Sequence, residues 1–191
     1  MLPPIHYFPG ALQRQYNTHQ LLHALQTQLN RQQYPIRMFG KTVMQPRLVS
    51  FAGDTGISYT YSQTMLTGSG RPPLLAQLKT FIQTQYSIVL NSVLCNRYRN
   101  GHDSMGRHAD DEPELGPDPV IVSMSLGASR TFALKHKKIA GRNHRIVLHD
   151  GDILIMDRGC QTDWLHAIPK TTKPLTDRIN LTWRQIINNT K

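Results

Sequence analysis

Short β-rich runs fill the chain from residue 87 onward, and this texture constrains the fold more than any other feature. Val, Ile, Leu and Thr recur in segments separated by Gly, Pro, Asp and Asn, which is typical of strands joined by turns. Asp150-Gly151, between two such runs, predicts a hairpin turn. Residues 99–119 are rich in Gly, Pro and Asp and are expected to form a loop. The second half therefore predicts an antiparallel sandwich or jelly roll.

Two segments before residue 87 carry the apolar spacing of helices instead. Leu21, Leu25 and Leu29 recur every fourth residue behind a candidate N-cap, Thr18. Residues 69–87 repeat the pattern, with prolines near the first turn. At 191 residues the chain has the length of a single domain. The order of elements predicts an α+β fold.

The charge balance favours a phosphate-rich partner. The formal net charge is +10, and basic residues gather locally, as at Lys135, Lys137 and Lys138. Neutralising phosphates releases their counterions, so such a field suits nucleic acid, although a merely soluble basic protein is the alternative. The chain has two cysteines, no signal-peptide pattern and no apolar run of membrane-spanning length. These features predict a reducing intracellular compartment and no membrane.

The segment DRINLTWRQ, residues 177–185, combines a strand pattern with two arginines. Alternate residues of a strand share a face, so one face would carry Arg178, Asn180, Thr182 and Arg184. By itself the segment predicts an edge strand with a solvated basic face. Alternatively, a guanidinium on this face pairs with the carboxylate of a bound keto acid, because it offers two parallel donors.

A His-x-Asp pair and a later histidine form a candidate metal site. On an extended segment, His108 and Asp110 point to the same side, but composition alone makes such a pair common. His166, at the end of a later β-rich run, is the candidate third ligand. Two imidazoles and a carboxylate suit non-haem Fe(II), since they leave positions for a co-substrate and oxygen. The competing interpretation is a core His166 and a surface His108.

Four segments, NRYRNGHDSMGRHADDE, SMSLGASRTFALKHK, LHAIP and RINLTWRQ, resemble the AlkB family of Fe(II)- and 2-oxoglutarate-dependent nucleic-acid dioxygenases. The similarity spans about residues 36–188 and is closest to the branch that repairs duplex DNA. The resemblance implies a double-stranded β-helix (jelly-roll) core with N-terminal helices packed against it. Within a single domain, residues 1–191, about 1–86 would form helices and a substrate-recognition lid, and about 87–191 the catalytic core.

The resemblance also implies an activity and its cofactors. The activity is oxidative demethylation of N-alkylated bases, such as 1-methyladenine and 3-methylcytosine, in flipped-out nucleotides of DNA. It would be coupled to decarboxylation of 2-oxoglutarate to succinate, with release of formaldehyde. Fe(II), 2-oxoglutarate and molecular oxygen are the implied cofactors.

Carried over by motif, the family's site residues fall on specific positions. The implied iron ligands are His108, Asp110 and His166. The implied 2-oxoglutarate contacts are Asn96, Tyr98, Arg178, Asn180, Thr182 and Arg184. Arg178 would pair with the far carboxylate, and Arg184 would lie near the carboxylate at the metal. Glu112 matches a residue near the exocyclic amino group of the target base.

The block RMFGKTVMQPRLVSFAGDTGISYTYS resembles the substrate side of the duplex-repair branch, where an apolar finger fills the gap left by the flipped nucleotide. The implied finger is Met38, Phe39 and Gly40, although Phe39 as a buried core residue is the alternative. Tyr61 would stack on the flipped base opposite His108, and Tyr59 would hydrogen-bond nearby. Lys41 and Arg47 would contact phosphates. Met38 and Tyr61 stand where valine and phenylalanine are usual, and both keep the required shape.

Several alternatives stay open on the sequence alone. Within the family, the substrate could be single- or double-stranded DNA, RNA or protein. Outside it, the same triad suits a metal-dependent phosphoesterase, or the chain is a nucleic-acid-binding module without catalysis. No heptad or large apolar stripe is evident, so a monomer is expected. The lack of the long N-terminal extension common in eukaryotic members favours a bacterial cytoplasmic protein; a eukaryotic one would be nuclear.

Overall fold

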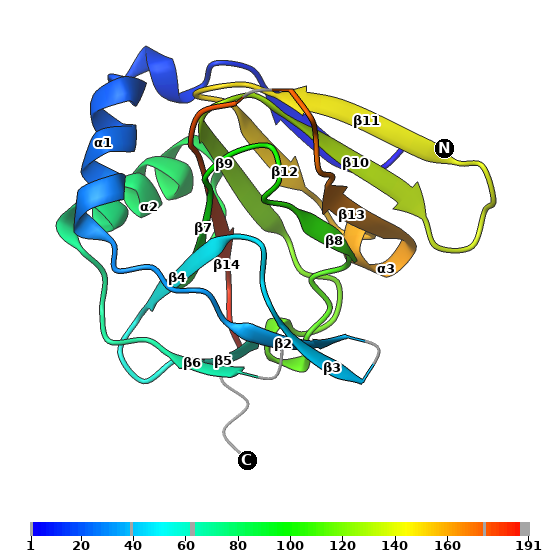
Figure 1. The fold of residues 1–191 in the computed structure, drawn as a ribbon. Helices are drawn as coiled ribbons and strands as arrows, with labels where there is room; N and C mark the ends of the chain where they lie inside the picture. Colours follow the sequence, from blue (N-terminus) through cyan, green and yellow to red (C-terminus); the bar gives the residue numbers. More distant parts are fainter. Residues whose placement is uncertain (1, 39, 62–63, 174, 188–191) are drawn as a thin grey trace.

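Two antiparallel sheets face each other and form the body of the protein (Figure 1). The computed structural model describes residues 2–38, 40–61, 64–173 and 175–187. The major sheet is ordered β1 (Ile5–Phe8), β12 (Ile153–Met156), β9 (Ile121–Gly127), β14 (Arg178–Arg184), β7 (Ser92–Tyr98) and β4 (Leu48–Gly53). The minor sheet is ordered β11 (Asn143–Leu148), β10 (Arg130–His136), β13 (Trp164–Ile168) and β8 (Met105–His108). The predicted antiparallel, β-rich second half is confirmed.

Two small hairpins lie apart from these sheets. They are β2 (Pro35–Met38) with β3 (Lys41–Met44), and β5 (Ser58–Tyr61) with β6 (Thr64–Thr67). Gly40 makes the β2–β3 turn with φ +77°, a left-handed conformation that glycine adopts without steric cost. In Figure 1 both hairpins lie at one end of the molecule, below the two sheets.

The helices lie on the outer side of the major sheet (Figure 1). They are α1 (Thr18–Gln28) and α2 (Pro73–Tyr86), and short turns are formed by η1 (Leu12–Arg14), η2 (Pro113–Leu115) and α3 (Cys160–Asp163). Leu25 of α1 and Leu78 of α2 belong to the same buried cluster as Val93, Leu181 and Trp183. Asn17, and not Thr18 as predicted, caps α1, because its side chain accepts from the Gln20 N–H at 3.0 Å.

The strand β14 lies in the middle of the major sheet, between β9 and β7. All seven of its residues are buried, so the edge-strand interpretation with a solvated basic face is wrong. Ile179, Leu181 and Trp183 join the helix-side cluster. The opposite face, which carries Arg178 and Arg184, therefore points between the two sheets.

Two predictions made from turn residues are wrong, because pairing with strands distant in the sequence decides the structure of both segments. Asp150-Gly151 does not close a hairpin: β11 pairs with β10 in the minor sheet, whereas β12 pairs with β9 and β1 in the major sheet. Asp150 holds this crossing by accepting from the Gly127 N–H at 2.7 Å and the Thr18 hydroxyl at 2.5 Å. Within the expected loop 99–119, residues 105–108 form β8, because β13 supplies a partner strand.

Candidate metal centre and co-substrate cavity

The three predicted metal ligands meet between the sheets at the end of β8. His108 lies directly opposite His166 in the β8–β13 register, and their ring centroids are 4.2 Å apart. Asp110 follows β8 by two residues. One ligand atom from each of the three residues lies within 4.8 Å of the others. Such a set of donors has the spacing that a single metal ion requires.

Asp110 is held as a carboxylate although it is buried. The Arg184 guanidinium donates to Asp110 Oδ2 at 2.9 Å, and His108 Nε2 lies 3.5 Å from Oδ1. Burial alone raises the pKa of Asp110, but the charge of Arg184 and the hydrogen bond with His108 outweigh it and hold the pKa well below its ordinary value. The carboxylate is therefore available to a cation over the physiological pH range.

His166 is held in its neutral form. Burial, with a contribution from neighbouring His108, lowers the pKa of His166 to about 3. Its ring stacks on Phe132 with centroids 5.3 Å apart, which fixes its orientation. Neutral imidazole is the form that binds a metal, so His166 and Asp110 both have the protonation state that a metal ligand requires.

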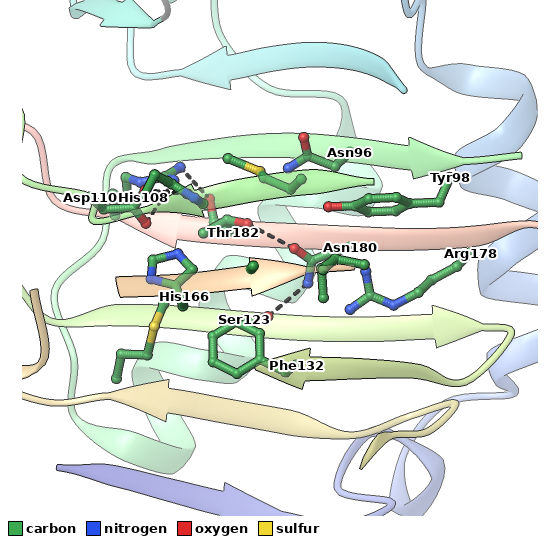
Figure 2. Close-up of a pocket in the computed structure, with 15 residues that line it drawn as sticks. Asn96, Tyr98, His108, Asp110, Ser123, Phe132, His166, Arg178, Asn180 and Thr182 are labelled. Atoms are coloured by element: carbon green, nitrogen blue, oxygen red, sulfur yellow. Dashed lines mark hydrogen bonds and ion pairs between the residues drawn. The ribbon is translucent and has the colours of Figure 1, made fainter. Parts of the chain in front are cut away.

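A cavity extends from the triad along β14. It is lined by fifteen residues of both sheets, among them Asn96, Tyr98, Arg178, Asn180, Thr182 and Arg184, all of which were predicted to contact a keto acid. Figure 2 shows the triad at one end of this cavity and Tyr98 with Arg178 at the other. The strand β14 runs between the two ends, and every second residue from Arg178 to Arg184 lines the cavity.

Arg178 is a buried cation whose hydrogen-bonding capacity is only partly used. Its Nη2 donates to Ser125 Oγ at 2.9 Å, and its guanidinium lies over the Tyr98 ring, 5.2 Å from the centroid. Among the described residues, Nε and Nη1 have no hydrogen-bond partner. Burial lowers the pKa of Arg178 to about 10, so it stays charged at neutral pH. A bound carboxylate would satisfy both the charge and the free donors, and this fits 2-oxoglutarate.

The middle of the cavity is a closed polar network. Asn180 donates to Ser123 Oγ at 2.7 Å and to the Met124 carbonyl at 2.8 Å, and Thr182 donates to Asn180 Oδ1 at 2.9 Å. Because these groups satisfy one another, Asn180 and Thr182 shape the cavity wall. Ser123 and Ser125 were missed by the sequence analysis, although their alternation within SMS places both on the cavity face of β9.

Tyr59 and Glu112, which were predicted to contact the target base, lie near Arg184 and His108 respectively. Tyr59 is buried, stacks on Phe51 with ring centroids 5.9 Å apart, and lies under the Arg184 guanidinium. Burial and the Asp110 carboxylate raise the pKa of Glu112. Lys41 is exposed at the β2–β3 hairpin. The side chains of Met38 and Tyr61, and all of Phe39, lie outside the described residues, so their predicted roles stay predictions.

Residues 4–184 match the family model of the 2OG-Fe(II) oxygenase superfamily. The chain belongs to this superfamily. Mouse DNA oxidative demethylase ALKBH2 is 36% identical over 163 residues, covering 82% of this chain and 68% of that protein. Human ALKBH2 is 36% identical over 159 residues, covering 80% and 61%. Human alpha-ketoglutarate-dependent dioxygenase alkB homolog 3 is 40% identical over 154 residues, covering 76% and 53%. The resemblance to the AlkB family is thereby confirmed.

The chain spans about three-fifths of the length of the ALKBH2 proteins it matches first, 59% of the bovine and 61% of the human protein. A solved structure of OsALKBH1 superposes with a TM-score of 0.68 at 18% identity, covering 97% of this chain and 99% of that one, which shows the shared fold. The superfamily takes Fe(II) and 2-oxoglutarate, as predicted from the motifs. In the part of the chain that the structure describes, no helix is both long and apolar enough to cross a membrane.

The position of Arg47 in this 2OG-Fe(II) oxygenase corrects one prediction. Arg47 is buried, and its guanidinium donates to Asn96 Oδ1 at 2.8 Å and to the Ser104 carbonyl at 3.2 Å. A phosphate contact needs an exposed cation, and Arg47 does not supply one. It instead fixes Asn96, which lines the co-substrate cavity.

Gln161 is a further residue that the motifs did not indicate. It is buried in α3, five residues before His166, and its Oε1 accepts from the Asp110 N–H at 2.9 Å. Lys137 donates to the Gln161 carbonyl at 2.7 Å. Gln161 thus ties the loop that carries Asp110 to the segment that leads into His166.

Proposed function

We propose that this protein is a DNA oxidative demethylase that repairs N-alkylated bases such as 1-methyladenine and 3-methylcytosine. The observation that carries the proposal is the pairing, in one cavity, of a His-Asp-His triad with the buried Arg178, whose free donors suit a carboxylate. When bound, Fe(II), 2-oxoglutarate and oxygen supply the oxidation that hydroxylates an N-methyl group and so releases it as formaldehyde. The names of the ALKBH2 relatives point to DNA as the substrate.

His108, Asp110 and His166 would hold the iron. The protein sets the protonation states of Asp110 and His166 before any ligand arrives: Arg184 keeps Asp110 ionised, and burial keeps His166 neutral. Two imidazoles and one carboxylate would hold the ion through three ligands and would leave coordination positions for exogenous ligands. This donor set distinguishes an oxygenase centre from a closed structural metal site.

The co-substrate would lie along β14. Arg178 would take the far carboxylate, with Tyr98 packed against the guanidinium and Arg184 near the metal end. Asn96, Asn180 and Thr182 would line its length. The cavity is enclosed by both sheets, which keeps water away from the reacting atoms and strengthens each charge interaction.

The alkylated base would enter from the side of the triad occupied by Tyr59 and Glu112. Methylation at these ring nitrogens gives cationic bases, which aromatic faces and a carboxylate favour. Such bases also pair badly, which lowers the cost of flipping them out of the duplex. Following the motif, Tyr61 would stack on the base, opposite His108. The finger formed by Met38, Phe39 and Gly40 would fill the gap left by the flipped nucleotide, and Lys41 would contact phosphate.

The proposal also assigns a role to each part of the fold. Residues from about 87 onward supply the sheets of a double-stranded β-helix, and α1 and α2 buttress its major sheet. The hairpins β2–β3 and β5–β6 would form the substrate-recognition lid. We also propose that the protein acts as a monomer, with RNA as a second substrate class.

Formaldehyde release from an oligonucleotide carrying 1-methyladenine tests the function. Turnover should need Fe(II), 2-oxoglutarate and air together and should be lost in His108→Ala and Arg178→Ala. Phosphate release without 2-oxoglutarate or oxygen would instead support a phosphoesterase. Parallel assays on duplex DNA, single-stranded DNA and RNA rank the substrates, and Phe39→Ala is expected to harm duplex turnover more than single-strand turnover.

A further inference from the structure

Gln45 occupies a rigid position in the connection between β3 and β4. Its backbone N–H donates to the Tyr34 carbonyl at 3.0 Å, and its carbonyl accepts from Gln33 Nε2 at 2.7 Å. Pro46 follows, and then Arg47, whose guanidinium is held by Asn96. Because the backbone is held on both sides, the Cα–Cβ bond of Gln45 has a fixed direction.

The side-chain amide of Gln45 is buried and unsatisfied. The residue is 1% exposed, and neither Oε1 nor Nε2 has a hydrogen-bond partner in the described part of the chain. Buried side-chain amides are almost always hydrogen-bonded, so an amide with both ends free has the capacity to pair with a group that arrives from outside.

The surroundings of Gln45 show where that partner would lie. Gln45 lines a groove of about 330 Å³ together with Ile36, Met105, His108 and Glu112. His108 and Met105 also line the co-substrate cavity, so the groove meets the candidate metal centre on its substrate side. Glu112 Oε2 is a second buried atom without a hydrogen-bond partner among the described residues. The Gln45 amide and this Glu112 oxygen thus offer unused hydrogen-bonding capacity in one groove beside the triad.

We propose that Gln45 reads the edge of the alkylated base, as a specificity-determining residue. This inference rests on the proposed function. An amide presents one donor and one acceptor side by side, which matches the edge of 1-methyladenine where the amino group adjoins the N7 acceptor. On 3-methylcytosine, whose ring nitrogen beside the amino group is methylated, the amide oxygen would accept from the amino group alone. The carboxylate of Glu112 supplies acceptors only. The two side chains together select alkylated bases that carry an exocyclic amino group, the adenine and cytosine class, over thymine-type lesions.

Binding in the absence of turnover tests the proposal. The probes are two oligonucleotides of one sequence, with and without a single 1-methyladenine, and the protein is loaded with Mn(II) and 2-oxoglutarate without oxygen. Fluorescence anisotropy should show that Gln45→Leu loses about ten-fold of the preference for the methylated strand. Gln28→Leu, at an exposed position of α1, is the matched control and should keep the preference.

Thermal unfolding separates a reading role from a structural one. Gln45→Leu removes a buried amide that has no partner among the described residues, so the Tm of the unliganded variant should stay equal or rise. A lower Tm with an unchanged preference for the methylated strand would overturn the proposal. In turnover assays, the variant should lose more activity on 1-methyladenine than on 3-methylthymine, and equal losses would also count against it.

The outcomes for the wild-type protein separate this inference from the proposed function. Selective binding of the methylated strand that Gln45→Leu abolishes, without formaldehyde release under full turnover conditions, would overturn the demethylase and leave Gln45 as a reader. Wild-type protein that binds both strands equally would overturn the role of Gln45, even if the protein turns over.

Discussion

His108 and His166 are direct register partners across β8 and β13, with ring centroids 4.2 Å apart. Side chains at such a position point to the same face of the sheet, and a slip of one residue would turn one imidazole away. The ladder between these strands therefore sets the distance between the two histidine ligands before a metal binds.

Metal binding should stabilise this preformed site. Adding Mn(II) to metal-free protein is expected to raise the Tm, because a ligand that binds only the folded state stabilises it by mass action. His166→Ala should show little or no rise, since two ligands remain of three. Differential scanning fluorimetry over a Mn(II) series checks this, with Ca(II) as the control ion. An equal rise in the variant would place the metal elsewhere.

Replacing Gln161 should weaken the metal site through Asp110. Gln161→Leu leaves the buried Asp110 N–H without its acceptor, so unfolding should become easier by about 1–3 kcal/mol and Mn(II) affinity should fall. Gln161→Glu keeps an acceptor oxygen and should recover part of the Mn(II) affinity. Gln77→Leu, at an exposed site on α2, is the control and should change neither quantity. Unchanged Mn(II) affinity in Gln161→Leu would contradict the positioning role.

The two buried arginines of β14 should respond in opposite ways to the same substitution. Arg184 pairs with buried Asp110, so Arg184→Met leaves the Asp110 carboxylate buried without its cationic partner. This should lower the free energy of unfolding by about 3–5 kcal/mol. Chemical denaturation of the metal-free protein measures this cost. A cost below 1 kcal/mol, at the level of a surface pair, would show that Asp110 does not depend on Arg184.

Arg178 has no acidic partner among the described residues, and its Nε and Nη1 are unsatisfied. Arg178→Met should therefore leave the metal-free protein as stable as wild type or more stable. The same variant should raise the KM for 2-oxoglutarate by more than about ten-fold and lose the Tm rise that 2-oxoglutarate gives to wild type. Arg178→Lys should recover little, because an ammonium lacks the two parallel donors. Loss of stability in Arg178→Met would refute the assignment of the free donors to a ligand.

The buried cysteines should make the protein less stable in alkali. Burial raises the pKa of Cys95 and of Cys160 to about 12 each, above the ordinary thiol value of 9.0. The unfolded thiols release protons first as pH rises, so stability present below pH 9 is lost between about pH 9 and pH 12. At pH 10 the loss should be on the order of 1 kcal/mol for Cys95. Denaturation at pH 7 and pH 10 measures it, and Cys95→Ala should show a smaller loss.

Sequence patterns determined the elements and the identity of the central residues. Alternation in RINLTWR placed two arginines on one face of a strand, and the HxD pair marked His108 and Asp110 as candidate metal ligands. These features are local, since the side-chain period of a strand fixes the faces without knowledge of its neighbours. The motif resemblance supplied the order of the segments and the family.

The tertiary structure decided what those faces meet. Strand pairing makes residues 105–108 the strand β8, although their composition predicts a loop. It also places β11 and β12, on either side of Asp150-Gly151, in different sheets, and it buries the arginine face of β14. Arg47 became a support for Asn96, and Gln45 and Gln161 gained roles that no motif indicated. Partner choice and register depend on contacts between residues far apart in the chain, and short sequence patterns do not encode them.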